Sequence, residues 1–256
     1  MRERTPKTVL VTGASSGIGR ALVLEFAKRG AHVVASARRE AELASLCAEV
    51  AAAGGKSSFA VCDVSDPEAA AEMVRKAERD LGSLDMLISN AGVGGSTHSS
   101  RLDVASVSRM IDVNVRGAIA PLVAAIPIML GQQRGQLVGV SSLAGRRALP
   151  TAAVYNATKA ALSVFLEGLS MDLGPAGIRV TDVQPGFVAT EMTSRNKFKM
   201  PFLWDTEKAA HHIADRLEHA PRILAFPLPM DLLTRLQKHL PYALHSWATR
   251  RLAGDR

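Results

Sequence analysis

Short apolar runs alternate with stretches of helical periodicity along most of the chain. Apolar runs of this kind, bounded by turn-forming residues, are typical of strands that are buried on both faces. They predict strands at residues 8–13, 31–37, 58–64, 84–90, 135–142, 177–186 and 222–227. Between these runs the apolar residues recur every three or four positions, which is the period of a helix with one buried face.

The segments between the predicted strands carry helix signals of their own. Asp66 and Pro67 have the character of a helix cap and a first helical residue, and Gly30 that of a helix stop. Helices are expected at residues 19–30, around 43–50, at 67–81, about 103–130, through Tyr155 to about 173, and from 206 onward.

The alternation of buried strands with helices predicts a parallel sheet that is covered by helices on both faces. No internal repeat, low-complexity tract or linker interrupts the pattern before about residue 186. The sequence therefore predicts one doubly wound α/β domain over residues 1–256, with a sheet of about seven strands and extra helices at the C-terminal end.

Bulk composition narrows the class of protein. The chain has 256 residues, of which 47% are hydrophobic, enough for one buried core. The two cysteines, Cys47 and Cys62, are expected in that core rather than in a disulfide framework, which favours a cytoplasmic location. The N-terminus has no apolar signal core, and we expect no apolar run of the roughly 18 residues that a membrane span needs.

The net charge of +7 is concentrated towards the end of the chain, where residues 222–256 hold six Arg or Lys and two Asp. Such a charge suits an anionic ligand, nucleic acid or a membrane surface. With 4% aromatic residues and no RNA-binding or zinc motif, nucleic acid is not expected. His211 and His212 are adjacent and have no clustered partners, so no metal site is expected.

A glycine-rich loop joins the first predicted strand to the first helix. It contains Gly13, Ser15, Ser16, Gly17, Ile18 and Gly19. Glycines let the backbone turn sharply and approach a pyrophosphate, which the N–H groups at the helix start then bind. No Lys-Ser or Lys-Thr pair follows the last glycine, so this is not a nucleoside triphosphate loop. Its position predicts a dinucleotide site; the alternative is an ordinary tight turn.

The end of the second predicted strand indicates which dinucleotide binds. An NAD site has an Asp or Glu there for the ribose hydroxyl, whereas this chain has Ala37 followed by Arg38 and Arg39. Two guanidinium groups without a carboxylate suit a 2′-phosphate, and Ser15 can add a hydroxyl. We therefore expect NADP(H), with NAD(H) as the less favoured cofactor. The alternative is a solvated pair of arginines that opens a helix.

Tyr155 and Lys159 lie four positions apart on a predicted helix, so their side chains are neighbours. A cation beside a tyrosine favours the phenolate and lowers the pKa of the phenol, which suits a general acid. Taken alone, the pair fits better with a tyrosine that packs on a lysine stem. Ser142 stands thirteen residues before Tyr155.

Together these motifs resemble the short-chain dehydrogenase/reductase family, with a Rossmann-like fold. The resemblance covers about residues 7–192 and rests on motifs that occur in the family's order. They are TGASSGIG, CDV, NAG, IDVNVRG, VSS, YNATK and QPGFVAT. The resemblance implies an enzyme that transfers a hydride between a nicotinamide cofactor and a carbonyl or secondary alcohol.

The resemblance also implies a role for each matching residue. The family's catalytic tetrad corresponds to Asn114, Ser142, Tyr155 and Lys159. Tyr155 would be the general acid or base, Ser142 would hold the substrate oxygen, and Asn114 would anchor a water that relays protons to Lys159. The lysine would also bind the nicotinamide ribose. Further cofactor contacts are expected from Asp63 and Val64 at the adenine, Asn90, Ala91 and Gly92 along the nucleotide, and Pro185, Gly186, Val188 and Thr190 at the nicotinamide.

Two segments after the last motif bear on the substrate. The lid segment, residues 191–205, carries the basic residues Arg195, Lys197 and Lys199 before the apolar run 200–204. It suits either a mobile cover for a lipophilic carbonyl or a loop packed on the core. The C-terminal extension, residues 228–256, is amphipathic and basic and is broken at Pro241. Such helices contact anionic membranes, pack on a partner subunit or cover a pocket.

Several functions remain open at this level. A reductase of lipophilic carbonyls is favoured, a 3-oxoacyl-thioester reductase is the narrower alternative, and a low-turnover NADPH-binding sensor or scaffold is the alternative outside catalysis. A membrane-bound interaction protein ranks third. By resemblance we expect a homodimer, or a tetramer, through the helices around residues 103–130 and 151–173.

Overall fold

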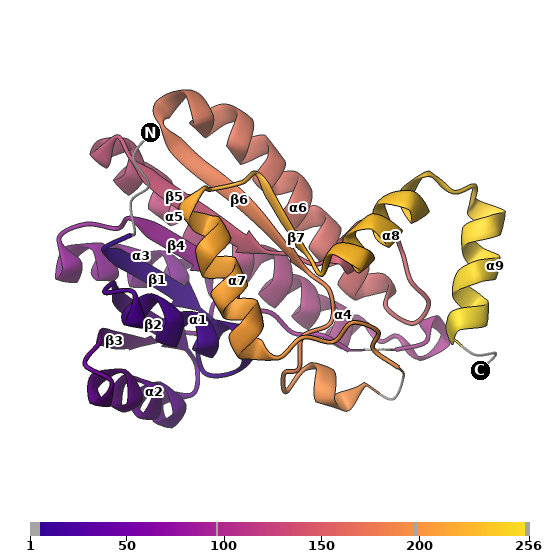
Figure 1. Cartoon of the computed structure of the whole chain (residues 1–256), viewed down its shortest axis with the longest axis horizontal. Helices are drawn as coiled ribbons and strands as arrows, with labels where there is room; N and C mark the ends of the chain where they lie inside the picture. Colours follow the sequence, from indigo (N-terminus) through magenta and orange to yellow (C-terminus); the bar gives the residue numbers. More distant parts are fainter. Residues whose placement is uncertain (1–5, 96, 197–198, 254–256) are drawn as a thin grey trace.

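The computed structural model of the chain is an open, twisted sheet with helices on both faces (Figure 1). It describes residues 6–95, 97–196 and 199–253, without the side chains of residues 195 and 250–253. The sheet contains seven parallel strands in the order β3-β2-β1-β4-β5-β6-β7. They are β1 (Thr8–Thr12), β2 (His32–Ala37), β3 (Lys56–Val61), β4 (Met86–Ser89), β5 (Gly135–Val140), β6 (Ile178–Pro185) and β7 (Ile223–Phe226).

The helices form two layers, each over its own core. They are α1 (Gly17–Lys28), α2 (Glu40–Ala52), α3 (Pro67–Leu81), α4 (Val104–Ile111), α5 (Gly117–Gln132), α6 (Ala153–Leu173), α7 (Thr206–Glu218), α8 (Leu228–His239) and α9 (Tyr242–Ala253). Helices α1, α2 and α7 cover one face, where Phe26, Leu43 and Ile213 are buried. Helices α3, α5 and α6 cover the other, around Leu122 and Leu162. The predicted single doubly wound domain is confirmed.

Local signals placed the ends of several elements correctly. Asp66 caps α3, since its Oδ1 accepts hydrogen bonds from the backbone N–H of Glu68 and Ala69. Gly30 follows α1 with a φ of +89°, a conformation that glycine adopts without strain. The third strand was placed too late, because Asp63 accepts hydrogen bonds from the N–H and hydroxyl of Ser65. This turn takes the chain out of the sheet after Val61.

The long helix expected near residues 103–130 is present but contains a π-helical segment. Helix α4, the π segment Asp112–Arg116 and α5 run on without a break. Together they form a 29-residue helix, Val104–Gln132, that is long and apolar enough to cross a membrane. By length and composition alone, this contradicts our expectation that no apolar run reaches the roughly 18 residues of a membrane span, because Pro121 and Pro127 do not end the helix. In the structure the helix packs on α3 and on the sheet.

The C-terminal extension forms α8 and α9, which lie at the right of Figure 1, beyond the carboxyl ends of the strands. The predicted break at Pro241 is confirmed. Leu240, the residue before this proline, has the extended backbone that a following proline imposes. Residues 254–256 of the extension lie outside the described residues.

Candidate functional site

The strand order opens a crevice between β1 and β4, where chain connections leave in opposite directions. Doubly wound folds bind ligands at this position. The hydroxyl of Thr12, at the end of β1, accepts hydrogen bonds of 3.1 Å from the backbone N–H of Asn90 and of Ala91. The Asn90 amide donates to the Thr12 carbonyl at 3.0 Å. The predicted nucleotide residues after β4 are therefore held beside the glycine loop.

The glycine loop allows no side chains at its three glycines. Gly13 and Gly17 have φ angles of +68° and +56°. A Cβ at Gly13 would lie 2.7 Å from Cα of Ala91, and one at Gly17 would lie 3.0 Å from Cγ2 of Thr190. A Cβ at Gly19 would lie 2.4 Å from the carbonyl oxygen of Gly13. This bare backbone leads directly into the start of α1, so the residues present fit a pyrophosphate.

The close packing at Gly19 makes a prediction about stability. We expect Gly19→Ala to lower the free energy of unfolding by about 1–3 kcal/mol, because its methyl group has backbone on one side and Asn90 on the other. Gly168→Ala is the matched control: Gly168 lies in α6 with nothing near its Cβ position, so alanine should stabilise by about 0.5–1 kcal/mol. Urea unfolding measures both; an unchanged midpoint for Gly19→Ala would contradict the packing described here.

The two predicted arginines lie beside this loop. Nε of Arg39 donates to Oγ of Ser15 at 3.1 Å, and its NH1 lies 3.2 Å from Oε2 of Glu191. Arg38 is more exposed, and its NH1 lies 3.5 Å from Oδ2 of Asp63. Arg39 is therefore tied to the glycine loop rather than freely solvated, which weighs against the alternative reading of a solvated pair.

The residues expected at the adenine form a turn at the end of β3. Partial burial raises the pKa of Asp63, but hydrogen bonds from Ser65 and the charge of Arg38 outweigh it and hold the pKa below its usual range. Val64 is buried against α5, where a Cβ on Gly117 would lie 2.8 Å from the Val64 carbonyl oxygen. The turn is thus rigid and negatively charged, close to Arg38.

Tyr155, Lys159 and Ser142 meet where β5 ends and α6 begins. The Ser142 hydroxyl lies beside the phenol of Tyr155, close enough to favour its ionised form. It also donates to the Pro185 carbonyl at 3.3 Å. Nζ of Lys159 lies 5.8 Å from the centre of the Tyr155 ring and donates to the Val140 carbonyl at 2.9 Å. The structure therefore brings together three of the four residues expected in the tetrad.

The pKa values of Tyr155 and Lys159 are both changed by burial. Burial raises the pKa of Tyr155, and the neighbouring Ser142 hydroxyl, which lowers it, only partly offsets this effect. Burial also lowers the pKa of Lys159 to about 8, against the opposing charge of Asp182. We expected the lysine to lower the pKa of the phenol. Here burial dominates for both groups, because each charged form loses hydration.

Asn114, the fourth expected member, lies in the π segment and is fully buried. Its Oδ1 accepts from the N–H of Val93 at 2.8 Å, and its Nδ2 donates to the Val93 carbonyl at 2.8 Å and to Oγ1 of Thr158 at 3.2 Å. The amide thus clamps the loop after β4 to α6. A Cβ on Gly92 would lie 3.4 Å from both Oδ1 of Asn114 and Nζ of Lys159, so the clamp adjoins the lysine.

The residues expected at the nicotinamide come at the end of β6 and just after it, next to Ser142, α8 and the glycine loop. Pro185 ends β6 and accepts the hydrogen bond of Ser142. A Cβ on Gly186 would lie 2.8 Å from Sδ of Met230 on α8. Val188 is buried and forms a bridge with Trp204, and Thr190 faces Gly17 of the glycine loop.

The lid segment is fastened near its C-terminal end to the chain that precedes it. The N–H of Trp204 donates to the Phe187 carbonyl at 3.0 Å, and the N–H of Ala189 donates to the Trp204 carbonyl at 2.8 Å. The Trp204 ring stacks on Phe226 with centroids 5.0 Å apart. Trp204 is therefore a core anchor, which favours the alternative of a loop packed on the core for this residue. Lys197 lies outside the described residues.

Sequence reasoning did not identify Met192 and Gly94 as site residues. A Cβ on Gly94 would lie 2.7 Å from Sδ of Met192 and 3.7 Å from Cε2 of Tyr155. Met192 therefore lies close to the phenol, across Gly94. The one available signal was an apolar residue two positions after Thr190, and only the folded chain places it beside Tyr155.

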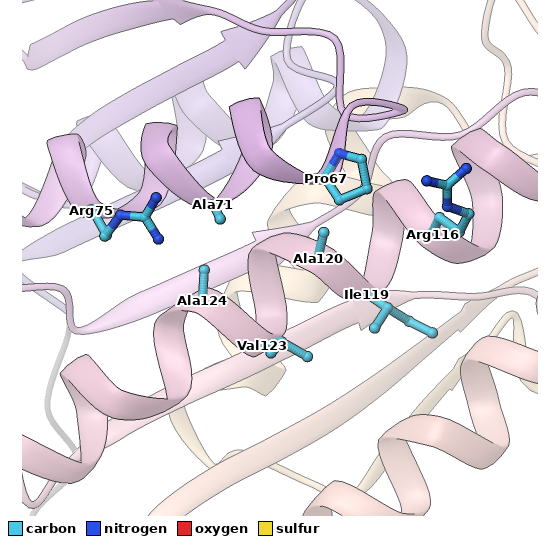
Figure 2. A pocket seen from close by; sticks show the side chains of 8 residues that line it. All are labelled: Pro67, Ala71, Arg75, Arg116, Ile119, Ala120, Val123 and Ala124. Carbon is cyan, nitrogen blue, oxygen red and sulfur yellow. The ribbon is translucent and has the colours of Figure 1, made fainter.

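Two hollows on the protein differ in whether the predicted site residues line them. A pocket of about 50 Å³ is lined by Tyr155 itself, with Leu102, Val107, Met110 and Val154 among its apolar residues. A groove of about 480 Å³ lies between α3 and α5, where Figure 2 shows Ala120 and Ala124 facing Ala71. None of the predicted site residues lines this groove, so it is not the substrate site.

The adjacent histidines point in different directions. Nδ1 of His211 lies 3.0 Å from Oε1 of Glu25, whereas the His212 ring packs edge-on against Trp204 at 5.3 Å. Within residues 6–95, 97–196 and 199–253, no three His, Cys, Asp or Glu side chains gather closely enough to hold a metal ion.

Known proteins share both the sequence and the fold. The family model described as short chain dehydrogenase matches residues 7–200. An uncharacterised oxidoreductase of Myxococcus xanthus is 44% identical over 252 residues, which are 98% of this chain and 100% of that protein. Another, from Staphylococcus saprophyticus, is 33% identical over 196 residues, 75% of this chain and 83% of that protein.

A solved short-chain dehydrogenase/reductase of Burkholderia phymatum, in complex with NAD, superposes with a TM-score of 0.85 at 25% identity. The match covers 93% of this chain and 94% of that one. The glycine loop at the β1–β4 crevice and the tyrosine, lysine and serine beside it agree with this relationship. The chain therefore belongs to the short-chain dehydrogenase/reductase family of NAD(P)-binding oxidoreductases.

Proposed function

We propose that the protein is an NADP(H)-dependent enzyme that reduces a carbonyl, or oxidises the corresponding secondary alcohol, on a lipophilic substrate. The observation that carries the reaction is the convergence of Ser142, Tyr155 and Lys159 at the carboxyl end of β5. The hydrogen bond between Arg39 and Ser15 supports NADP(H), because it holds a guanidinium beside the glycine loop, and a guanidinium can bind a 2′-phosphate.

The residues divide the chemistry between them. When bound, the nicotinamide cofactor supplies or accepts the hydride at the substrate carbon. Ser142 orients the substrate oxygen by a hydrogen bond, and Tyr155 donates its phenolic proton to that oxygen during reduction. Lys159 holds a positive charge close to the ring and favours the phenolate left behind. Asn114 fixes the loop that adjoins the lysine.

The pKa of Lys159 makes a prediction about pH. Reduction needs a protonated pair, so kcat/KM for reduction should fall as pH rises through about 8, and that for oxidation should rise over the same range. Rates measured between about pH 6 and 10 in both directions test this. Arginine stays protonated throughout, so the activity that Lys159→Arg retains should lack this inflection. A flat profile for the unmodified enzyme would contradict the assignment.

A lipophilic substrate is supported by the side chains around Tyr155. The pocket that Tyr155 lines is mostly apolar, and Met192 lies across Gly94 from the phenol. Phe202 and Leu203 of the lid segment are exposed. These groups favour a substrate whose body is buried by apolar contact and whose single carbonyl meets Ser142 and Tyr155.

The decisive experiment is cofactor oxidation with a panel of carbonyls. The panel contains medium- and long-chain aldehydes, steroid ketones, 3-oxoacyl thioesters and small quinones, each with NADPH and NADH. We expect turnover with NADPH confined to the apolar members. Turnover on thioesters alone would favour the 3-oxoacyl reductase, and tight NADPH binding without turnover would favour a sensor.

We further propose a homodimer through α4, α5 and α6. These helices expose apolar side chains at Val104, Ile111, Val123, Val164 and Met171. The groove beside Ala120 and Ala124 gives a second copy close access to α5 (Figure 2). Light scattering should report a dimer, and Ala124→Arg should shift it towards monomer. A monomeric unmodified protein would refute the proposal.

A cytoplasmic enzyme with peripheral membrane contact is the remaining proposal. Helices α8 and α9 expose the apolar residues Leu228, Leu232, Leu233, Leu236, Tyr242, Leu244 and Trp247. The exposed Arg235 and Lys238 on α8 provide positive charge for anionic lipids. The protein should sediment with vesicles of anionic lipid and not with neutral ones, and Leu232→Glu should weaken this binding. No binding to anionic vesicles would rule the proposal out.

A further inference from the structure

A chain of buried polar side chains connects the catalytic end of the sheet to α8. Asp182 on β6 accepts hydrogen bonds from the Ser141 hydroxyl and, at 2.6 Å, from Nε2 of Gln184. Oε1 of Gln184 accepts from Nε of Arg146 at 2.7 Å. NH1 of Arg146 donates to Oδ1 of Asp231 on α8 at 2.6 Å. The network thus starts from the strand behind Lys159 and ends on the C-terminal extension.

The donors and acceptors allow one orientation of this chain. A guanidinium only donates hydrogen bonds, and an ionised carboxylate only accepts them. Gln184 lies between one of each, so its carbonyl faces Arg146 and its NH2 faces Asp182. Every link therefore has a fixed direction, and none can be reversed without leaving a buried polar atom unpaired.

Arg146 is held almost entirely by α8. Besides the carboxylate, its NH1 reaches the Asp231 carbonyl at 3.1 Å and Oγ1 of Thr234 at 3.0 Å. The side chains of Arg146 and Asp231 are only 12% and 8% exposed. Burial raises the pKa of Asp231, but hydrogen bonds from Arg146 and Arg235 hold it below its usual range, so the carboxylate stays charged.

The next two residues bind the same extension. Arg147 donates hydrogen bonds to the carbonyls of Gln237 and Lys238 at the end of α8. Nε2 of His245, on α9, donates to the Ala148 carbonyl at 2.9 Å. Three consecutive residues between Ser142 and Tyr155 therefore hold α8 and α9.

The Ser142 turn is closely packed between this anchor and α6. Ser142 caps the 3-10 turn Leu143–Gly145 by accepting from the N–H of Ala144 at 3.1 Å. A Cβ on Gly145 would lie 2.8 Å from the carbonyl carbon of Lys159. Arg146 follows the turn directly, so a displacement of its side chain moves the turn against α6.

We propose that Asp231 is a positioning residue, which through Arg146 holds the Leu143–Gly145 turn and the Ser142 hydroxyl against Tyr155. Helix α8 is then part of the support of the catalytic group and not an appendage. The proposal rests on the role given to Ser142 in the proposed function. Asp231→Asn keeps the shape of the side chain but removes the charge that faces Arg146.

The first test is the kinetics of Asp231→Asn. We expect kcat to fall about tenfold to a hundredfold, because the serine and phenol lose their alignment, while the Kd of NADPH stays unchanged. Glu167→Gln is the matched control, since Glu167 pairs with Arg222 in an exposed ion pair on α6 and should leave kcat unchanged. A kcat for Asp231→Asn within twofold of the unmodified enzyme would overturn the proposal.

The double variant Arg146→Met/Asp231→Leu separates positioning from stability. Apolar residues that replace a buried ion pair often restore stability, whereas they cannot reproduce the directional bonds to Gln184 and Thr234. We expect its Tm to recover towards that of the unmodified enzyme and its kcat to remain low. Recovery of both would show a structural role only and would overturn the proposal.

Hydrogen–deuterium exchange makes the inference independent of turnover. In Asp231→Asn the peptides covering residues 142–149 should exchange about tenfold faster, and those of β1 should be unchanged. If the unmodified enzyme turned over no substrate in the panel, the proposed function would fail. The exchange measurement would still decide whether Asp231 holds the Leu143–Gly145 turn. Unchanged exchange at 142–149 would overturn it.

Discussion

Replacing Tyr155 with phenylalanine is expected to lower kcat by about 10²–10⁴-fold and to leave the Kd of NADPH unchanged. The change removes one oxygen, the atom that in the proposed mechanism gives its proton to the substrate, and that lies beside the Ser142 hydroxyl. The ring keeps its packing beside Lys159 and Gly94, so the cofactor site should not change. Steady-state rates and NADPH fluorescence titration measure the two quantities separately.

The chain offers a matched control, because its other tyrosine, Tyr242, is exposed at the start of α9. Tyr242→Phe removes the same oxygen from an exposed side chain and should leave kcat unchanged. If Tyr155→Phe retained full activity, the proton would have to come from another group, and the proposed mechanism would be wrong.

Arg39→Ala is expected to raise the Kd of NADPH about tenfold to a hundredfold and to change that of NADH little. A hydrogen bond to a charged group contributes about 1.5–3 kcal/mol, which corresponds to this range. NADH lacks the 2′-phosphate, so it loses no such bond. Fluorescence titration of both cofactors with the variant measures the difference.

Arg79→Ala is the control for a lost positive charge, because Arg79 is exposed on α3 and pairs with Glu72. The converse change, Ala37→Asp, places a carboxylate at the end of β2 beside Arg38 and should shift preference towards NADH. The Burkholderia phymatum structure has a similar fold and holds NAD, so the fold by itself is not an argument for NADP(H). Equal NADPH affinity in Ala37→Asp would show that the phosphate pocket lies elsewhere.

The sequence alone predicted the fold class and the places of most motif residues. Buried strands, the Asp66 cap and the Gly30 stop are local properties, because each depends on residues within a few positions. The crevice follows from them, since parallel strands bring the Gly13 loop and Asn90 to the same end of the sheet. Spacing on one helix likewise determined that Lys159 lies near Tyr155.

Other outcomes depended on how strongly side chains are buried. The pKa of Tyr155 is raised rather than lowered, since the loss of hydration exceeds what neighbouring groups return. For Trp204 the sequence left open a mobile cover or a loop packed on the core, and only its packing on Phe226, 22 residues further along the chain, decides for the core. Neither degree of burial can be deduced from the neighbouring residues in sequence.

By itself, the sequence determined the doubly wound domain, the glycine loop and the helix that carries tyrosine and lysine, because local periodicity and turn chemistry decide each of them. Only the tertiary structure decided that Asn114 clamps Val93 to Thr158 and that Met192 adjoins Tyr155. It alone decided that Arg146 joins Asp231, 85 residues away. Such pairs form only when elements that are distant in sequence pack together. A polar or charged side chain that is buried there needs a hydrogen-bond partner, and no local sequence pattern predicts which residue provides it.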